Sequence, residues 1–330
     1  MENCLTRAAE ELRDGFNKVT VRKVNELLGS VIDTGASVRG AYIEATQSHQ
    51  GILYANDRWK ELKSHLPRGK GEIVYAVPGF LTNSMFLNPT NNRMRQMGHD
   101  VREWGGLVNL TVTSKTIKNV RDEIYGLFKE NNYKPVPSYG HSLGGVLLKA
   151  VYEEAQDIMK PPVTMASPFN GVERNDGLVA RACKAVNGFS DLMDEVFFHQ
   201  LAQAAPAEIT HLNTRYDGII SPYSCVSLHD EKCENIEMGG GKDRYMITHV
   251  NIPFVLETAL VLADRLAQPE GEWQPFDETK YQHLQDAGLV HLHKPENMLH
   301  NRKPHLVPRP PHIPEDQRIR ILWPDSLQVA

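Results

Sequence analysis

The pattern of hydrophobic and polar residues changes near residue 69, and this change divides the chain. Before it, apolar residues recur every three or four positions, as amphipathic helices require, and no convincing strand occurs. These residues include Leu5, Ala8, Ala9, Leu12 and Phe16, and then Val21, Val24, Leu27, Leu28 and Val31. The sequence Pro67-Arg68-Gly69 then interrupts the pattern. Residues 1–68 are therefore predicted to form a helical N-terminal extension packed on the main body.

From residue 71 onward, short apolar runs alternate with amphipathic segments. The apolar runs predict buried strands, and the stripe of apolar residues in 114–132 predicts a helix. The predicted strands lie within residues 72–80, 99–104, 162–167, 207–213 and 234–239, and further helices begin at Leu143 and Ile252. Strands that alternate with helices indicate the α/β class, with a mostly parallel central sheet flanked by helices. Residues 69–268 are predicted to form this domain.

Two segments depart from the alternation. Residues 171–205 place an apolar face on one or two helices, which suits either ordinary packing or a lid over an apolar pocket. The candidate pocket or lid residues are Phe189, Leu192, Met193 and Phe197. After Pro269 the pattern ends, and residues 291–314 contain six prolines and five histidines. Residues 269–330 are predicted to form an extended arm that binds a protein partner or packs on the body of the molecule.

The segment GHSLGG, residues 140–145, is a candidate nucleophile site. It opens a helix after a strand-like stretch, which is the context in which G-x-S-x-G projects a serine hydroxyl from the edge of a sheet. Its glycines remove side chains where the turn and the helix crowd each other. Pro135 and Pro137 shorten the preceding strand, because proline lacks a backbone donor. Ser142 is predicted to be a nucleophile rather than a serine of a structural glycine turn.

A serine nucleophile needs a base, an acid that orients the base, and donors for an oxyanion. Asp217 follows a predicted strand in a tight turn, and His249 comes before a helix, so the chain holds the order Ser, Asp, His. Imidazole suits the base because its ordinary pKa lies near neutrality. The backbone N–H groups of Phe80 and Leu143 are the candidate oxyanion donors, since one follows an early strand and the other follows the serine.

Other residues compete for the acid and the base. The alternatives are Asp191, Asp230 and Asp243 for the acid, and His141, His211 and His229 for the base. Asp217 is preferred because Asp-Gly after a strand places a carboxylate in a tight turn. His211 is expected inside a strand and His229 in a solvated acidic loop. His141 is expected to pack beside the nucleophile, because adjacency in sequence points its side chain elsewhere.

The segments PGFLTNS, GHSLGG, MASPFNG, YDGIISP and THVNIP resemble the lipase-like and esterase-like members of the α/β-hydrolase superfamily, over roughly residues 70–268. The resemblance implies an α/β-hydrolase fold with nucleophile Ser142, acid Asp217, base His249 and oxyanion donors Phe80 and Leu143. The prolines before the serine, the helical extension and the Pro/His-rich tail depart from the family pattern. The motifs are specific for the superfamily but do not name a substrate.

Composition and charge exclude several classes of partner. The chain of 330 residues is 41% hydrophobic and 23% charged, with a formal net charge of -5 and no cluster of Lys and Arg. No nucleic-acid partner is therefore expected. No apolar stretch is long enough to span a bilayer, and the N-terminus lacks the features of a signal peptide, so a cytoplasmic location is expected.

No metal or organic cofactor is expected. The segment MGGGKDR, residues 238–244, fails the spacing of a phosphate-binding loop, and the tail histidines lack the spacing and cysteine partners of a zinc site. The four cysteines are too few and too scattered for a disulfide scaffold, and free thiols are expected. They are Cys4, Cys183, Cys225 and Cys233.

These features together predict a lipase-like enzyme or carboxylesterase that cleaves a lipophilic carboxylic ester through an acyl-enzyme on Ser142. An acyltransferase or thioesterase would use the same acyl-enzyme with another acceptor or leaving group, and the motifs do not separate these activities. A non-catalytic binding or scaffold protein with a hydrolase fold is the third interpretation. It is less favoured, because an inert fold has no reason to keep all three residue types of the triad.

Overall fold

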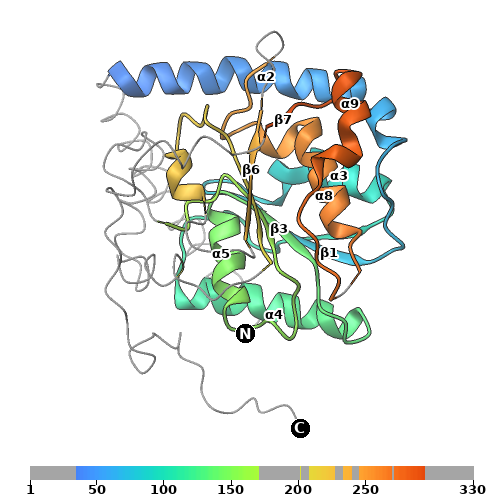
Figure 1. The fold of residues 1–330 in the computed structure, drawn as a ribbon. Coiled ribbons are helices and arrows are strands. Elements are labelled where there is room, and N and C mark those ends of the chain that lie inside the picture. The colour runs from blue at the N-terminus through green and yellow to red at the C-terminus, as the bar shows by residue number, and fades with distance from the viewer. Residues whose placement is uncertain are drawn as a thin grey trace, which may run out of the picture.

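The computed structural model describes residues 35–170, 201, 208–226, 233–239, 245–269 and 271–293 (Figure 1). Several expectations fall on other residues and lie outside this described part. They concern residues 1–34, the candidate lid with Phe189, Leu192, Met193 and Phe197, the competing residues Asp191, His229, Asp230 and Asp243, and the arm beyond residue 293.

A seven-stranded sheet lies at the centre of the molecule, in the order β2-β1-β3-β4-β5-β6-β7. Its strands are β1 (Ile73–Val77), β2 (Asp100–Glu103), β3 (Ser138–His141), β4 (Val163–Met165), β5 (Thr210–Asn213), β6 (Glu234–Met238) and β7 (Leu292–His293). Neighbouring strands from β2 to β6 pair in parallel, and β7 pairs antiparallel to β6. The predicted α/β class with a mostly parallel sheet is confirmed.

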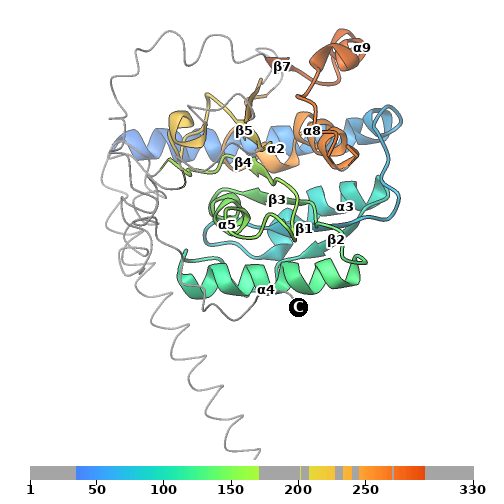
Figure 2. The ribbon, with the colours of Figure 1, turned by 60° about the horizontal axis from the view of Figure 1, so that its bottom comes forward.

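Helices cover both faces of this sheet (Figures 1 and 2). One face packs against α4 (Ser114–Glu130) and α5 (Leu143–Tyr152). The other packs against α2 (Gly35–Lys63), α3 (Asn88–Gln96) and α8 (Leu256–Leu266). Shorter elements are η1 (Ser84–Leu87), η2 (Pro222–Cys225), η3 (Ile252–Phe254), η4 (Glu278–Tyr281) and α9 (Gln282–Asp286).

The first strand shows why a continuous apolar run is required here. All five residues of β1 are buried. Ile73, Tyr75 and Val77 pack in the cluster with α4 and α5, whereas Val74 and Ala76 pack in the cluster with α3 and α8. Side chains alternate between the faces of a strand, so both sets must be apolar when both faces are covered.

Helix α4 forms where its apolar stripe was predicted. Ile117, Val120 and Ile124 are buried against the sheet, and the helix ends at Glu130. The helix begins with a capping box, in which the N–H of Thr116 donates to Oγ1 of Thr113 (3.1 Å) and the N–H of Thr113 donates to Oγ1 of Thr116 (2.7 Å). Sequence pattern and local capping thus agree in this element.

The helical nature of the N-terminal extension is confirmed for α2, which packs directly on the domain. Ala55, Trp59 and Leu62 are buried in the same cluster as α8. The indole Nε1 of Trp59 also donates to Oε1 of Gln96 at 2.9 Å. These contacts make α2 part of the main body rather than a loose appendage.

The segment after residue 268 differs from the prediction, because residues 271–293 contain η4, α9 and β7 instead of an extended arm. Leu284, Leu289 and Val290 are buried in the core, and the hydroxyl of Tyr281 donates to Oδ2 of Asp264 at 2.6 Å. A two-residue strand and a five-residue helix are too short to show a period, so the sequence pattern could not reveal them.

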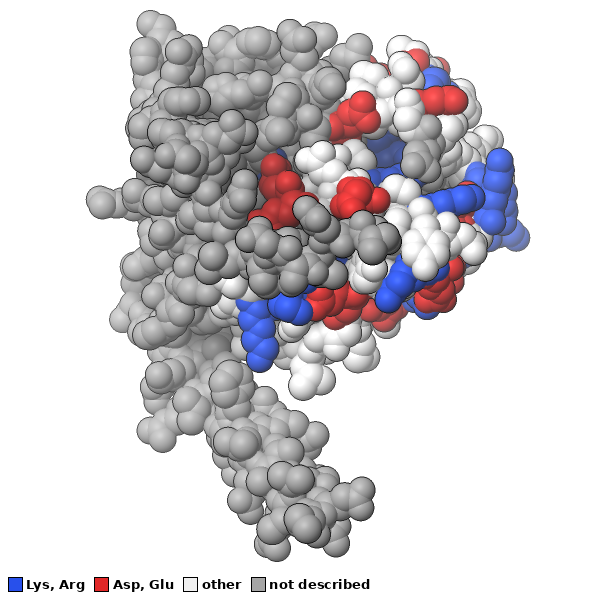
Figure 3. Space-filling model, turned by 90° about the horizontal axis from the view of Figure 1, so that it is seen from below, with Lys and Arg blue, Asp and Glu red and all other residues white. Residues whose placement is uncertain are grey.

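The surface seen in Figure 3 mixes the two signs of charge, with Lys and Arg beside Asp and Glu. Near α4, Nζ of Lys118 lies 2.5 Å from Oδ2 of Asp122, and Arg102 pairs with Asp100 and with Glu130. Among the described helices, none combines the length and the hydropathy of a transmembrane segment.

Candidate active site

Ser142 stands on the sharp turn between β3 and α5. Its backbone has φ 51° and ψ −122°, a conformation that residues with a side chain rarely adopt. The N–H of Ser142 donates to the carbonyl oxygen of Met165 on the neighbouring strand (2.8 Å). A strained serine between a buried strand and a helix matches the expected setting of a nucleophile.

Two glycines allow the chain to cross closely around this turn. A Cβ on Gly144 would lie 2.3 Å from the carbonyl oxygen of Val77, and a Cβ on Gly145 would lie 2.1 Å from Oγ of Ser167. No other residue type fits at either position without moving the neighbouring chain. The glycines of GHSLGG therefore bring α5 against the ends of β1 and β4.

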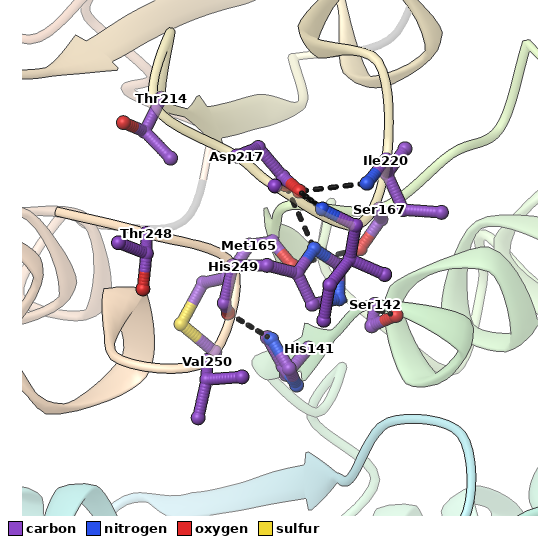
Figure 4. A network of polar contacts seen from close by, with 12 residues as sticks. His141, Ser142, Met165, Ser167, Thr214, Asp217, Ile220, Thr248, His249 and Val250 are labelled. Atoms are coloured by element: carbon purple, nitrogen blue, oxygen red, sulfur yellow. Dashed lines mark hydrogen bonds and ion pairs between the residues drawn. The ribbon is translucent and has the colours of Figure 1, made fainter. Parts of the chain in front are cut away.

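The structure brings Ser142, Asp217 and His249 together at the carboxyl end of the sheet (Figure 4). Nδ1 of His249 lies 2.7 Å from Oδ2 of Asp217, and Nε2 lies 3.0 Å from Oγ of Ser142. A carboxylate only accepts hydrogen bonds, so we assign the proton to Nδ1, which leaves Nε2 to accept from the serine hydroxyl. Chemically, this arrangement can take a proton from Ser142.

The carboxylate of Asp217 is fixed by the loop that carries it. Its Oδ1 accepts hydrogen bonds from the N–H groups of Ile219 (2.9 Å) and Ile220 (2.7 Å), which leaves Oδ2 for His249. The side chain of Asp217 is only 1% exposed. Burial and three hydrogen bonds hold this carboxylate in one orientation.

The electrostatic environment raises the pKa of His249 above its ordinary value of 6.5. Burial lowers this pKa, but the negative charge and hydrogen bond of Asp217, together with the charge of Glu44, outweigh burial. A raised pKa means a stronger base at the position next to Ser142.

His141 takes a packing and bonding role beside the nucleophile. Its Nε2 lies 2.9 Å from the carbonyl oxygen of His249, and a carbonyl can only accept, so Nε2 carries the proton. Burial, and then the neighbouring His249, lower the pKa of His141 to about 3. Its ring also stacks on Phe86, with centroids 5.3 Å apart. A ring that stays neutral and bonded in this way is not placed to act as the base.

The N–H groups of Phe80 and Leu143 are the oxyanion donors expected from the sequence, and both residues lie in segments next to Ser142. Leu143 is the first residue of α5, so its N–H has no acceptor inside the helix. The loop with Phe80 passes beside the nucleophile, because a Cβ on Gly79 would lie 3.0 Å from Cβ of Ser142. Neither N–H bonds to a backbone acceptor among the described residues.

The structure adds one residue that sequence reasoning missed. Glu44 of α2 is 5% exposed, and its carboxylate accepts hydrogen bonds from three backbone N–H groups. The donors are Gly218 (3.0 Å), His249 (3.1 Å) and Val250 (3.0 Å). A single glutamate in a helical stretch carries no motif, so no local signal could have identified it.

The remaining candidates lie outside this arrangement. His211 is buried within β5, as expected, and its Nδ1 lies 2.7 Å from Oγ1 of Thr164. Cys225 is buried and Cys233 is half-buried. Within the described ranges, no group of His, Cys, Asp or Glu side chains is arranged to hold a metal ion.

The parallel sheet, the serine on a strand-to-helix turn and the chain order Ser, Asp, His define an α/β-hydrolase fold. No family model matches the chain, and no curated protein sequence matches it.

Solved structures to which this chain is similar include lipase B of Aspergillus fumigatus, with 16% sequence identity and a TM-score of 0.49. That match covers 63% of this chain and 57% of the fungal lipase. The mature lipase BlEst2 of Bacillus licheniformis matches with 14% identity and a TM-score of 0.47, over 61% of this chain and 94% of the lipase. Est1E of Butyrivibrio proteoclasticus matches with 12% identity and a TM-score of 0.43, over 61% of this chain and 89% of Est1E. Similarities this low assign no activity to the chain.

Proposed function

We propose that this protein is a serine hydrolase that cleaves a carboxylic ester through an acyl-enzyme on Ser142. The observation that carries the proposal is the continuous hydrogen-bonded chain from Asp217 through His249 to Ser142, with distances of 2.7 and 3.0 Å. This chain ends on a serine held at positive φ at the start of a helix. A structural serine would need neither feature.

In the first half of the reaction, Nε2 of His249 takes the proton of Ser142 while Oγ attacks the ester carbonyl carbon. The negative charge that develops on the carbonyl oxygen is stabilised by the N–H groups of Phe80 and Leu143. When the tetrahedral intermediate collapses, the bond to the alcohol oxygen breaks and His249 returns its proton to that oxygen. The alcohol leaves, and the acyl group stays on Ser142.

In the second half, water attacks the acyl carbon and gives its proton to Nε2 of His249. The same two N–H groups stabilise the second oxyanion. Collapse breaks the bond to Oγ, and the proton on His249 returns to Ser142 as the carboxylic acid departs. Asp217 stabilises the imidazolium in both halves without taking its proton.

The proposal is tested by initial rates on p-nitrophenyl esters of graded acyl length, with Ser142→Ala beside the wild-type chain. We expect the substitution to reduce kcat by at least about 10³-fold, because the nucleophile is lost. A fluorophosphonate probe should label the wild-type protein on Ser142, as located by peptide mass spectrometry, and should not label the variant.

Ser138→Ala is the matched control, because Ser138 is also buried and lies on β3 at the opposite end of that strand. This variant should keep the ester activity and the labelling. Equal turnover by the wild-type protein and Ser142→Ala, or labelling at another serine, would contradict the proposal.

A further inference from the structure

The acid and the base of the triad lie on two separate loops, and α2 contacts both. Asp217 lies in the loop after β5, and His249 lies in the segment that leads into η3. Between these loops, Glu44 accepts the N–H of Gly218 on one side and those of His249 and Val250 on the other. One carboxylate therefore bridges the residue that follows the acid and the residue that is the base.

The bonding of His249 leaves its backbone little freedom. Its N–H donates to Oε1 of Glu44 (3.1 Å), and its carbonyl accepts from Nε2 of His141 (2.9 Å; Figure 4). The main chain of His249 is thus held from α2 on one side and from β3 on the other. The position of the imidazole depends on the position of the main chain and on the torsions χ1 and χ2. Bonds that fix the main chain therefore help to set where the imidazole lies between Asp217 and Ser142.

The bridge needs a carboxylate rather than any polar group. Three N–H donors converge on two oxygens, and a carboxylate offers only acceptors. A glutamine of the same length would turn an NH₂ group toward at least one of these donors. Donor would then face donor inside a buried site, where unsatisfied N–H groups are costly.

We propose that Glu44 is a positioning residue. It joins the loop of Asp217 to the segment of His249 and so keeps the imidazole of His249 within hydrogen-bonding distance of Ser142. The role rests on the proposed function of the triad. It gives α2 an indirect part in the reaction, through His249.

The test compares Glu44→Gln and Glu44→Asp with wild type in kcat, KM and the pH dependence of kcat/KM. We expect Glu44→Gln to lower kcat by about 10- to 100-fold with little change in KM, because the base is misplaced while the substrate contacts remain. The titratable groups that face His249 are Asp217, Glu44 and His141. Loss of the Glu44 charge should also lower the pKa of His249, so the acid limb of the kcat/KM pH profile should move to lower pH by about 0.5 to 1 unit. Glu44→Asp keeps the charge but shortens the reach, so its acid limb should stay near that of wild type while kcat falls.

A second measurement does not depend on turnover. The pKa of His249 is followed by NMR of its ring ¹³Cε1–¹Hε1 signal, assigned as the peak absent from His249→Ala, in wild type and in Glu44→Gln. We expect the pKa of His249 to be lower in Glu44→Gln than in wild type, by the same amount as the acid limb moves. If wild type turns over no ester and takes up no phosphonate, the proposed function fails, whereas the titration still shows whether Glu44 acts on His249.

The matched control is Glu234→Gln. Glu234 also accepts three donors, from Thr210, Arg265 and Phe276, but it lies at the amino end of β6, away from the triad. Glu234→Gln should keep kcat within about twofold and leave the pKa of His249 unchanged. The inference is overturned if Glu44→Gln keeps wild-type kcat and His249 pKa. It is equally overturned if Glu44→Gln loses activity with no pKa shift, since that result indicates only a structural role.

Discussion

His249 has a polar partner on both ring nitrogens and on both polar groups of its main chain. Asp217 and Ser142 lie at the ring, and Glu44 and His141 lie at the backbone. A residue held at two ring atoms and two main-chain atoms loses little further freedom when a reaction begins. Such preorganisation is how a site can keep reacting atoms close to the geometry that they need.

At the scale of residues, Asp217→Asn should reduce kcat by about 10³- to 10⁴-fold. The asparagine amide cannot stabilise the imidazolium, and its NH₂ group can favour the wrong tautomer of His249. Because the charge of Asp217 raises the pKa of His249, the variant should also show an acid limb at lower pH. In wild type, the midpoint of that limb should lie above pH 6.5. Initial rates from pH 5 to pH 9 measure the acid limb in wild type and in Asp217→Asn.

Asp264→Asn provides the comparison, since Asp264 on α8 pairs with Arg265 and accepts from Tyr281 outside the triad. Its pH profile should match that of wild type. A loss of less than about tenfold in Asp217→Asn would argue against Asp217 as the acid.

The sequence could indicate which three residues lie together at the candidate site, because each has a sign in the sequence. Ser142 lies in a glycine motif, Asp217 precedes a glycine after a strand, and His249 follows both in the required order. Glu44 has no such sign. Its partners lie 174 to 206 residues away, and only the folded chain places a carboxylate of α2 against those loops.

At the scale of elements, the site depends on how closely β1 and α5 approach. The carbonyl oxygen of Val77 occupies the space where a Cβ on Gly144 would lie, at 2.3 Å, and the carbonyl oxygen of Pro78 is 2.5 Å from the same point. Both obstacles are backbone atoms, which cannot rotate away. The loop that carries Phe80 begins at this contact, so the packing of two elements also sets the proposed oxyanion donors.

Gly144→Ala should therefore destabilise the protein by about 2 to 4 kcal/mol, measured as a lower urea midpoint with an unchanged m-value. Gly126→Ala is the opposite case, because a Cβ there meets nothing within 4 Å on the surface of α4. Alanine favours the helix interior, so Gly126→Ala should stabilise by about 0.5 to 1 kcal/mol. Equal effects of the two substitutions would contradict the steric argument.

The elements also show what a sequence pattern can and cannot reveal. The stripe of α4 and the apolar run of β1 are long enough for their periods to appear, and both were predicted. Strand β7 has two residues, which pair with Glu237 and Met238 of β6. Its position depends on tertiary packing. A sequence of two residues is too short to show a hydrophobic period that would predict it.

At the scale of the whole molecule, three of the described histidines resist protonation because they are buried. Burial lowers the pKa of His99, His141 and His211. Among the described residues, neither ring nitrogen of His99 has a hydrogen-bond partner, since Oε2 of Glu72 is 3.7 Å from Nδ1, too far for a hydrogen bond. These groups bind protons in the unfolded chain below about pH 6.5, and they bind them less readily in the folded protein.

Stability should therefore fall as the pH drops below about 6.5, because the unfolded state then binds more protons. Each such histidine contributes a slope of up to about 1.4 kcal/mol per pH unit. His249 acts in the opposite sense: its folded pKa is raised, so the stability that it adds is present at low pH and lost as pH rises through that pKa. His249 therefore offsets part of the effect of the other three histidines.

His99→Phe keeps a buried ring and removes one proton-binding site of the unfolded chain. The slope of unfolding free energy between pH 5.5 and pH 6.5 should become shallower by up to about 1.4 kcal/mol per pH unit, as measured by urea unfolding followed by tryptophan fluorescence. Between pH 7.5 and pH 8.5 the slopes of the two proteins should coincide. Parallel slopes at acid pH would show that His99 is protonated equally in both states.

The three hydrogen bonds of Glu44 also determine when the site can form during synthesis of the chain. Their sequence separations are 174, 205 and 206 residues, so the ribosome makes α2 long before it makes the loops that α2 holds. At about 5 to 20 residues per second, the interval is about 10 to 40 seconds. Contacts of such long range also form late in folding, because a large loop must close first. The growing chain therefore carries Ser142 for some time before it has a positioned base.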